Sequence, residues 1–543
     1  MSVELASGYH LENFLSLLRF VRGLYNDLLD TRERAYADQF ELLSAPSQSL
    51  YVRLILRKGP LFRSDKLNYA DIDDVDSAAQ ELIAAGLIST CASAGQLLTL
   101  LNKAELVALS PVAGAAKLRR EALVAQVAAT LEIHEQPLGF RYYRPLGTGR
   151  LRRFRLLYFG NLNQDFSDFV LADMGLLRFE CYAIPASARL FNNRGNIDFL
   201  WLLYQLQDIA DELIERQQTT TLIQFSAVLL ATVPVVGPAL IKRRWDRLLN
   251  RVARHLERCD QPHSALALYS VSQSPPARER STRLLNSSGQ TEAALALCRG
   301  IIEAPIDQQE LAFAYRFGQR ISKTLPAKQR IKAAVLDYTR RPLVLTRTQT
   351  SVEEAVRIFL EIDGGRCFYV ENSLVPGFFG LAFWDIIFAP VSGAFVNPFQ
   401  RGPLDLLGPG FSVARERAIA DRLETLAQPG QLANRVQQTL LEKHGLANYF
   451  VHWQRLKPDL VALALTRIPL RHWLVMFQRL LFDLKNNRSG FPDLIFFPAA
   501  GGYEMIEVKG PGDTLQESQK RWIRIFSEGD ISFSVATVKW SQP

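Results

Sequence analysis

The chain has 543 residues, too many for one hydrophobic core, and at roughly 150 residues per domain it is expected to form about three or four domains. Hydrophobic residues make up 48% and charged residues 22%, a globular balance that excludes collagen-like and largely disordered classes. Lysine and arginine exceed aspartate and glutamate by eight, which favours a polyanionic partner without identifying it.

The cysteines and the N-terminal sequence indicate the compartment. Five scattered cysteines, without a CxxC pair or a zinc-like His/Cys cluster, predict free thiols in a reducing environment. The start, "MSVELASGYHLENFL", carries early acids and lacks the basic and apolar regions of a signal peptide. The uncharged stretch 221–241 contains Gln224, two prolines and a glycine, so we expect a buried helix and a turn rather than a membrane span.

Residues 1–135 hold two candidate DNA-binding regions, 1–85 and 86–135. In the first, "SLYVRLILRKGPLFRSDKLNY" combines an apolar helical face with basic residues, which fits either a phosphate contact or a solvated polar face. In the second, "QLLTLLNKAELVAL" and "GAAKLRREALVAQVAATLE" predict two short helices. Lys117 and Arg119 lie where the second helix is expected to begin, and a helix N-terminus attracts phosphate, although ordinary helical hairpins show the same pattern.

The stretch "RYYRPLGTGRLRRFRLLYFGN" (141–161) carries six arginines within its first fifteen residues. It interleaves arginines with aromatic residues, as proteins that contact phosphates and unstacked bases do. Arg150, Arg152 and Arg153 are therefore candidate DNA contacts. The alternative is an arginine-lined interface between domains.

Nearly everything between 195 and 330 is expected to be helical. "ALALY" at 265 and "ALALC" at 294 are each followed by a proline a few residues later, which suggests a repeat of helix pairs similar to a tetratricopeptide array. Within "KRRWDRLLNRVARHLER", Arg243 and Arg244 begin a basic helical face that would line a nucleic-acid channel or simply face solvent.

The most informative stretch is "GFPDLIFFPAAGGYEMIEVKG" (490–510). "LIFF" and "YEMIEVK" are short apolar runs separated by a turn sequence, so they predict two strands of a hairpin. Side chains alternate along a strand, so Glu507 and Lys509 share one face, and Asp493 lies beside Glu507 on the neighbouring strand. The sequence thus predicts two carboxylates and an ammonium in one small patch.

Two adjacent carboxylates repel each other, and a divalent cation relieves that repulsion. Oxygen ligands favour Mg2+ or Mn2+ over zinc, and we expect one or two such ions. Lys509 would hold an attacking water or stabilise the charge that develops on a phosphate.

The segment after the hairpin predicts a helix and a further strand. In "PGDTLQESQKRWIRIF", Thr514 and Glu517 have the spacing of a capping box, and "ISFSVATV" alternates as a strand. The order strand, strand, helix, strand matches the core of PD-(D/E)xK nucleases. The alternative is that such short motifs arise by chance in a long chain.

The stretch "GFPDLIFFPAAGGYEMIEVKGPGDTLQESQKRWI" resembles the VRR-NUC domain and, with "ENSLVPGFFGLAFWDIIF" and "NPFQRGPLDL" upstream, the Fanconi anaemia-associated nuclease family. The resemblance implies that Glu371, Asp493 and Glu507 hold metal, with the Val508 carbonyl as a possible further ligand. It also implies that Lys509 is the catalytic lysine and that Gln519 occupies a position where related nucleases often keep a glutamine. These five side chains, Glu371, Asp493, Glu507, Lys509 and Gln519, are the candidate catalytic set.

The resemblance extends to nearly the whole chain. "LNKAELVAL" and "KLRREALVAQV" resemble a SAP-type module, and the family also carries a tetratricopeptide-like region. We therefore expect a multidomain, mainly α protein with an α/β PD-(D/E)xK domain at its C-terminal end. The expected domains are an N-terminal helical region at 1–85, a SAP-type module at 86–135, a tetratricopeptide-like domain at 136–330 and a VRR-NUC domain at 331–543. No ubiquitin-binding zinc finger is expected, as in bacterial-type members.

The implied function is a metal-dependent nuclease that cuts DNA near 5' flaps and in steps from the 5' end, in interstrand crosslink repair. Lys485 and Arg488 lie where part of a 5'-phosphate pocket is expected. The alternatives are a Holliday-junction-type resolvase and a non-catalytic repair scaffold. We expect branched or 5'-flap DNA as the partner, no membrane, and a cytoplasmic, nucleoid-associated location if the chain is bacterial.

Overall fold

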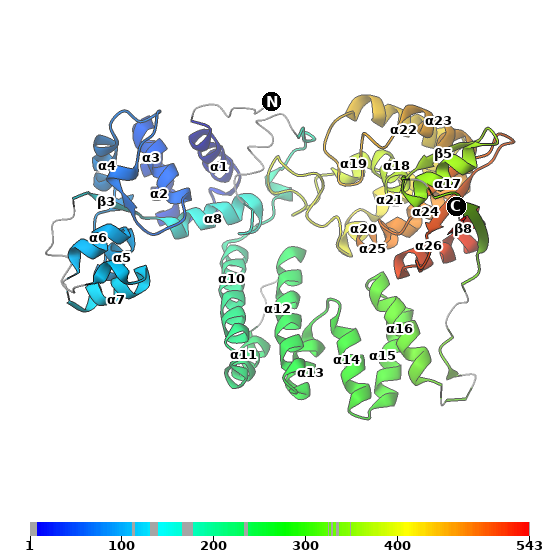
Figure 1. Ribbon diagram of the computed structural model, residues 1–543, viewed down its shortest axis with the longest axis horizontal. Coiled ribbons are helices and arrows are strands. Elements are labelled where there is room, and N and C mark those ends of the chain that lie inside the picture. The colour runs from blue at the N-terminus through cyan, green and yellow to red at the C-terminus, as the bar shows by residue number, and fades with distance from the viewer. Residues whose placement is uncertain are drawn as a thin grey trace. The chain divides into compact units, whose positions relative to one another are not determined.

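The protein is represented by a computed structural model (Figure 1) that describes residues 8–110, 114–130, 139–164, 177–232, 237–323, 325–326, 329–332, 336–347 and 349–541. The chain divides into two compact units, Met1–Leu176 and Leu177–Pro543. The predicted boundary at residue 135 lies outside the described residues.

The first unit begins with amphipathic helices. α1 buries Phe14, Leu17, Val21 and Tyr25 along one face, because apolar residues recur there every three or four positions. A capping box starts α2, in which the Asp30 side chain accepts from the Glu33 N–H. The helices are α1 (Tyr9–Tyr25), α2 (Thr31–Glu41), α3 (Ala45–Leu56), α4 (Val75–Ala84) and α8 (Thr148–Phe159). Three short strands form a sheet in the order β1 (Phe62–Arg63), β3 (Tyr142–Pro145), β2 (Ile88–Ser89). A 3-10 turn, η1 (Ser64–Lys66), follows β1.

The segment from 94 to 130 has its own small core. It comprises α5 (Ala94–Leu100), α6 (Lys103–Leu109), η2 (Ala115–Lys117) and α7 (Arg120–Thr130), which pack around Leu97, Leu106 and Leu123. The first predicted helix is in fact two, because Asn102 caps a new helix after Leu101.

After its opening segment, the second unit continues with helices that pack against their neighbours in chain order (Figure 1). The two repeated sequences lie at equivalent places, "ALALY" in α13 and "ALALC" in α15, the first helix of each consecutive pair. The elements are η4 (Ala186–Ala188), α10 (Arg194–Glu215), α11 (Thr219–Ala231), α12 (Ala239–Arg258), α13 (Pro262–Val271), α14 (Ala277–Ser287), α15 (Thr291–Glu303) and α16 (Gln308–Ile321).

A five-stranded sheet follows, with the strand order β4-β8-β7-β6-β5. β4 and β7 run parallel to β8, whereas β5, β6 and β7 pair antiparallel. The strands are β4 (Thr339–Leu345), β5 (Arg366–Tyr369), β6 (Leu494–Phe497), β7 (Glu504–Lys509) and β8 (Phe533–Trp540). The helices of this part are α17 (Val352–Glu361), α18 (Leu374–Ala382), α19 (Trp384–Ile387), α20 (Gly410–Ala414), α21 (Glu416–Leu426), α22 (Gln431–Lys443), α23 (Pro458–Arg467), α24 (Leu470–Phe482), α25 (Leu484–Asn487) and α26 (Glu517–Glu528).

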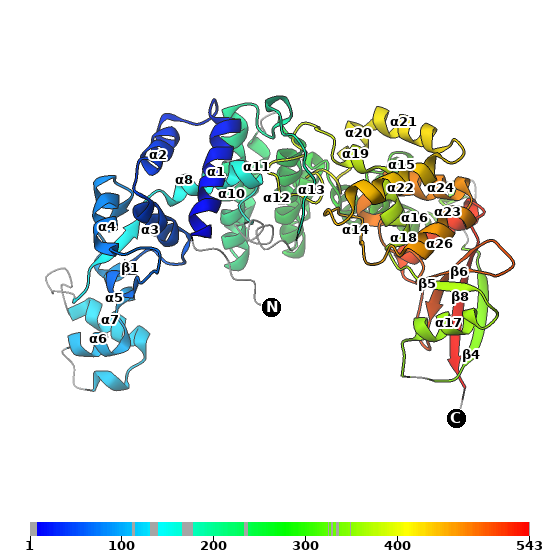
Figure 2. The same cartoon turned by 90° about the horizontal axis from the view of Figure 1, so that it is seen from above.

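Both faces of this sheet are covered, which explains its apolar strands (Figure 2). Leu494, Ile506 and Val508 pack against α17, while Ile495 and Met505 belong to a larger core shared with α18, α24 and α26. Glu507 and Lys509 alternate with the α17-facing residues, so they belong to the face that α26 covers.

The segment that opens the second unit packs on this larger core. Tyr182 lies against Phe388 and Phe395, and its hydroxyl donates to the Asn397 carbonyl at 2.6 Å. The Trp384 indole donates to Glu180 at 2.6 Å. Residues near 180 thus contribute to the core around the nuclease motif, although the sequence analysis assigned them to the domain at 136–330.

All five cysteines are free, as predicted.

Within the described part of the chain, no single helix is long and apolar enough to cross a membrane, and only α23 with α24, bent by 107°, passes as a pair by length and composition. The stretch predicted as a buried helix begins with α11, whose buried residues include Leu222 and Phe225, while Val228 is 55% exposed. Residues 233–236, part of the region in which a turn was expected after this helix, lie outside the described residues.

Candidate active site

Three of the predicted site residues meet at the centre of the sheet. The antiparallel register pairs Leu494 with Ile506, so Asp493 and Glu507 follow as neighbours at the next position. Asp493 Oδ2 accepts a hydrogen bond from the Val508 N–H at 2.9 Å. The Lys509 Nζ lies 2.8 Å from Glu507 Oε1, so the predicted shared face of these two side chains is confirmed.

Gln519 reaches the same patch from the first turn of α26. Its amide nitrogen donates to Glu507 Oε1, and its carbonyl oxygen accepts from the Gln516 N–H at 2.8 Å. The expected capping box of Thr514 and Glu517 is wrong, because α26 begins three residues after Thr514, at Glu517, and Gln516 is its N-cap. Gln519 therefore both caps the helix and orients a donor towards Glu507.

Glu371 arrives from the end of β5. The pairing of Tyr369 with Leu494 places the residue after β5 beside the residue before β6, and the Val370 N–H donates to the Asp493 carbonyl at 2.8 Å. The Glu371 side chain is exposed, and two neighbours hold its carboxylate: the Tyr369 hydroxyl donates to Oε2, and the Asn372 amide donates to Oε1 at 3.1 Å. Neither Tyr369 nor Asn372 was predicted from the sequence, since neither belongs to the PD or ExK motif.

The carboxylates of the patch resist ionisation. Burial raises the pKa of Asp493 to about 6 despite the hydrogen bond from Val508, and repulsion from Glu371 adds to the rise. Burial and then repulsion from Asp493 raise the pKa of Glu507 to about 8, although Lys509 acts in the opposite direction. A cation bound at the patch would therefore favour the ionised form of both carboxylates at neutral pH.

The donor set fits a hard divalent cation, because carboxylate oxygens are the ligands that Mg2+ and Mn2+ prefer. Among the described residues, however, no three His, Cys, Asp or Glu side chains are grouped closely enough to form a preformed metal site. Glu371 points to Tyr369 and Asn372, whereas Asp493 and Glu507 lie next to each other. Glu371 is held by these two hydrogen-bond partners and still lies close enough to Asp493 to raise the pKa of that carboxyl.

Two predicted DNA-binding residues lie close to this patch in the chain. Lys485 is exposed on α25, and Arg488 is exposed directly after it, with its guanidinium 5.2 Å from the centre of the Tyr449 ring. α25 leads directly into the turn that precedes Asp493. A phosphate role for both cations stays a prediction.

The candidate DNA-binding residues of the first unit differ in their exposure to solvent. Lys117, Arg119 and Arg152 are exposed. Arg153 is partly buried and lies 3.3 Å from the Glu33 carboxylate, while Arg150 lies over the Tyr36 ring. Arg150 and Arg153 thus contact other residues of the first unit, and a DNA contact by any of these residues stays a prediction.

Arg243 and Arg244 are also engaged within the protein. Arg243 donates to the Leu404 carbonyl at 3.4 Å and packs against Gly408, where a side chain would have no room. Arg244 lies over the Tyr204 ring at 4.9 Å. Burial lowers the pKa of both arginines. Their contacts link α12 to other parts of the second unit, and a DNA contact by either residue stays a prediction.

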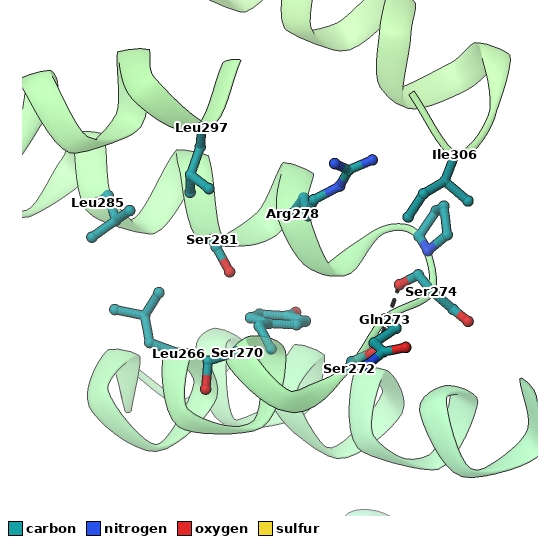
Figure 3. A pocket seen from close by; sticks show the side chains of 12 residues that line it. Leu266, Ser270, Ser272, Gln273, Ser274, Arg278, Ser281, Leu285, Leu297 and Ile306 are labelled. Carbon is teal, nitrogen blue, oxygen red and sulfur yellow. Dashed lines mark hydrogen bonds between the residues drawn. The ribbon is translucent and has the colours of Figure 1, made fainter. Parts of the chain in front are cut away.

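A cavity of about 670 Å³ opens between α13, α14 and α15 (Figure 3). Leu266, Leu285 and Leu297 give it an apolar wall, and Arg278 at its edge is paired with Glu310. It contains none of the predicted site residues. The candidate catalytic residues lie at the five-stranded sheet and in α26, not in this cavity.

Comparison with protein families agrees with that assignment. Residues 427–540 match the VRR-NUC domain, and residues 8–89 match the family described as "FAN1, HTH domain". The first match contains Asp493, Glu507, Lys509 and Gln519, whereas Glu371 precedes it. The α/β part of this mainly helical protein is therefore a VRR-NUC nuclease domain.

Relatives of known sequence and structure cover almost the entire chain. It is 36% identical to the Fanconi-associated nuclease 1 homolog of Pseudomonas aeruginosa, over 98% of this chain and 96% of the relative. It is 26% identical to the homolog of Oryza sativa, over 97% of this chain but 62% of that protein. A crystal structure of paFAN1 bound to 5' flap DNA with a two-nucleotide flap and a gap matches with a TM-score of 0.82 and 35% identity, over 99% of this chain and 100% of that one. The chain belongs to the Fanconi-associated nuclease 1 family and, given its higher identity to the Pseudomonas relative, to its bacterial type.

Proposed function

We propose that this protein is a structure-specific nuclease that hydrolyses phosphodiester bonds near 5' flaps and in steps from the 5' end, in the repair of DNA interstrand crosslinks. The observation that carries the proposal is the contact network of Asp493, Glu507, Lys509 and Gln519 on two adjacent strands and the first turn of α26. The similarity to paFAN1 bound to 5' flap DNA supports the choice of substrate.

The proposed catalytic roles follow from the charges. Glu371, Asp493 and Glu507 would hold one or two Mg2+ or Mn2+ ions, with the Val508 carbonyl as a further ligand. A divalent ion in such a site polarises the scissile phosphate and lowers the pKa of water. Lys509 would place its ammonium beside the attacking water or the developing phosphate charge, and its ion pair with Glu507 keeps that ammonium at the ligand set.

Gln519 is proposed to orient a ligand. Its carbonyl is fixed by the Gln516 N–H, so its amide N–H must face Glu507. This donor holds one oxygen of Glu507 in place while the other oxygen remains available. Outer partners of this kind set the direction of a metal ligand without touching the substrate.

We propose that the regions outside the nuclease domain bind the DNA backbone. Residues 86–135 would form a SAP-type module that presents Lys117 and Arg119, and α13 to α16 would form a tetratricopeptide-like array. Lys485 and Arg488 would contact the 5' phosphate. Such contacts read the shape and charge of the backbone rather than base sequence, so binding should weaken strongly with salt.

The test uses end-labelled 5'-flap DNA with Mg2+ or Mn2+ and compares the wild-type protein with Asp493→Ala. The proposal expects cleavage near the flap by the wild type and almost none by the variant. An intact flap with the wild type, or equal cutting by both proteins, would overturn it.

A four-way junction assayed in parallel tests the resolvase alternative. Paired symmetric cuts in the junction, with the flap left intact, would favour a resolvase. Tight DNA binding without cleavage under any metal would favour a scaffold.

A further inference from the structure

We propose that Asn372 is a positioning residue that fixes the Glu371 carboxylate relative to Asp493. The inference rests on the proposed function in one respect, namely that Glu371 holds metal. It is based on a contact between two segments that are far apart in the chain: the Asn372 side chain, just after β5, accepts hydrogen bonds from the backbone of residues 490 and 491, just before β6.

The direction of the Asn372 amide is fixed by its partners. Its Oδ1 accepts from the Gly490 N–H at 2.8 Å and from the Phe491 N–H at 3.3 Å. Because both partners are donors, the oxygen must face them, and the NH2 group must face the other way. There it donates to Glu371 Oε1 at 3.1 Å. One side chain thus joins a predicted metal ligand to the turn that leads into Asp493.

The backbone at this position suits asparagine. Asn372 has φ 51°, in the left-handed region that asparagine tolerates better than most residues other than glycine. This conformation turns the chain sharply between β5 and α18 and brings the side chain back towards residue 490. The Val370 N–H to Asp493 carbonyl bond, 2.8 Å long, fixes the same two segments by their backbones.

The turn that Asn372 holds also touches α26. Gly490 has φ 90°, and a Cβ there would lie 2.6 Å from Ser518, so the turn packs tightly against the residue before Gln519. Phe491 packs against Trp522 with ring centres 3.9 Å apart. Asn372 therefore connects Glu371 to the turn before Asp493 and, through that turn, to α26, which carries Gln519. Without Asn372, the Glu371 side chain would have to be ordered each time a metal ion binds.

The experiment measures Mn2+ binding to the full chain without DNA, by the EPR signal of free Mn2+. Asn372→Gly keeps the left-handed backbone and removes the amide, and Asn372→Asp keeps the acceptor but sets an oxygen against Glu371. Both variants are expected to weaken Mn2+ binding by about tenfold or more. Their melting temperatures, measured in EDTA, report any loss of folding separately. Asp260→Gly, at another left-handed position (φ 57°) in the helical array, is the matched control and should bind Mn2+ as the wild type does.

Glu371→Ala separates this inference from the proposed function. If Asn372 acts through Glu371, Mn2+ binding by the double variant Glu371→Ala, Asn372→Gly should be no weaker than that by Glu371→Ala alone. Cleavage by Asn372→Gly should also recover at high Mn2+. Weak binding by Glu371→Ala together with wild-type binding by both Asn372 variants would overturn the role of Asn372 alone. Wild-type binding by Glu371→Ala would overturn the metal role of Glu371 and the inference with it.

Discussion

Lys509 and Glu507 form an ion pair of 2.8 Å inside the nuclease domain, where their side chains are 11% and 2% exposed. Alternate residues of one strand meet on one face, so the pair follows from the ExK spacing itself. A buried carboxylate needs such a partner, and a phosphate that approaches the carboxylates meets the same ammonium.

We expect Lys509→Ala to lower the cleavage rate of 5'-flap DNA by about 100-fold or more, because it removes a preorganised positive charge. DNA affinity measured in EDTA should change little, since one buried lysine contributes little to the binding of a long duplex. Lys520→Ala is the matched control, because Lys520 pairs with Glu517 at the outer side of α26. A rate within about twofold of the wild type for Lys509→Ala would contradict the role of this lysine.

The contribution of Asp493 and Glu507 to the stability of the metal-free protein should fall as the pH rises from about 4 to about 8. The pKa of Asp493 is raised to about 6 and that of Glu507 to about 8, above their values of about 4 in an unfolded chain. At these two sites the folded state therefore binds more protons than the unfolded state, and the stability that they contribute falls as those protons leave. Asp493→Asn removes one of the two charges and should raise stability at pH 8 by on the order of 1 kcal/mol.

Thermal melts in EDTA at pH 5 and pH 8 test this expectation. Asp493→Asn should melt above the wild type at pH 8 and close to it at pH 5, where the wild-type carboxyl is largely protonated. Asp385 provides a control of opposite sign. Burial is the largest single effect and opposes its ionisation, but the hydrogen bonds from Arg422 together with the charges of Arg422 and Arg435 lower its pKa. Asp385→Asn should therefore reduce stability at pH 8. A lower melting temperature for Asp493→Asn at pH 8 would contradict the proposed repulsion.

The cleavage rate should depend more on the charge of residue 519 than on its size. Gln519→Ala removes the donor to Glu507, whereas Gln519→Glu sets a further carboxylate against it. We expect both variants to cut more slowly, and Gln519→Glu to lose at least about tenfold more than Gln519→Ala, because like charges repel in a buried site. Rates measured over a range of Mn2+ concentrations test this order, with Glu517→Gln at the same helical turn as control. Equal or reversed rates would show that Gln519 does not act through Glu507.

Local sequence patterns predicted the hairpin that carries Asp493 and Glu507. The other features of the site depend on contacts between residues that are far apart in the chain. The strands around Asp493 and Glu507 followed from apolar alternation and a turn sequence, which depend on neighbours in the chain. Glu371 was assigned only through the family resemblance, since nothing in its own sequence places it beside residue 493. Thr514 was misassigned as a helix cap because Gln519, three residues after Gln516, serves the same purpose. The role of Asn372 depends on partners that are more than one hundred residues away.

The predicted DNA-binding residues should divide into two groups by their present contacts. Exposed cations such as Lys485 and Arg488 have room to contact phosphates, whereas Arg243 is packed against Leu404 and Gly408. Each phosphate contact that is lost should reduce the slope of log affinity against log salt by about 0.9. We expect Lys485→Ala and Arg488→Ala each to show this reduction without a change in melting temperature.

Arg243→Ala should act instead through folding. The variant leaves the Leu404 carbonyl without its donor and opens space beside Gly408, so we expect a lower melting temperature, by an amount that corresponds to about 1–3 kcal/mol, and an unchanged salt slope. Arg216→Ala, which removes an exposed cation paired with Glu212, is a charge-matched control and should alter neither quantity. A reduced salt slope for Arg243→Ala at a wild-type melting temperature would instead make Arg243 a phosphate contact, since a purely structural arginine has no way to change counterion release.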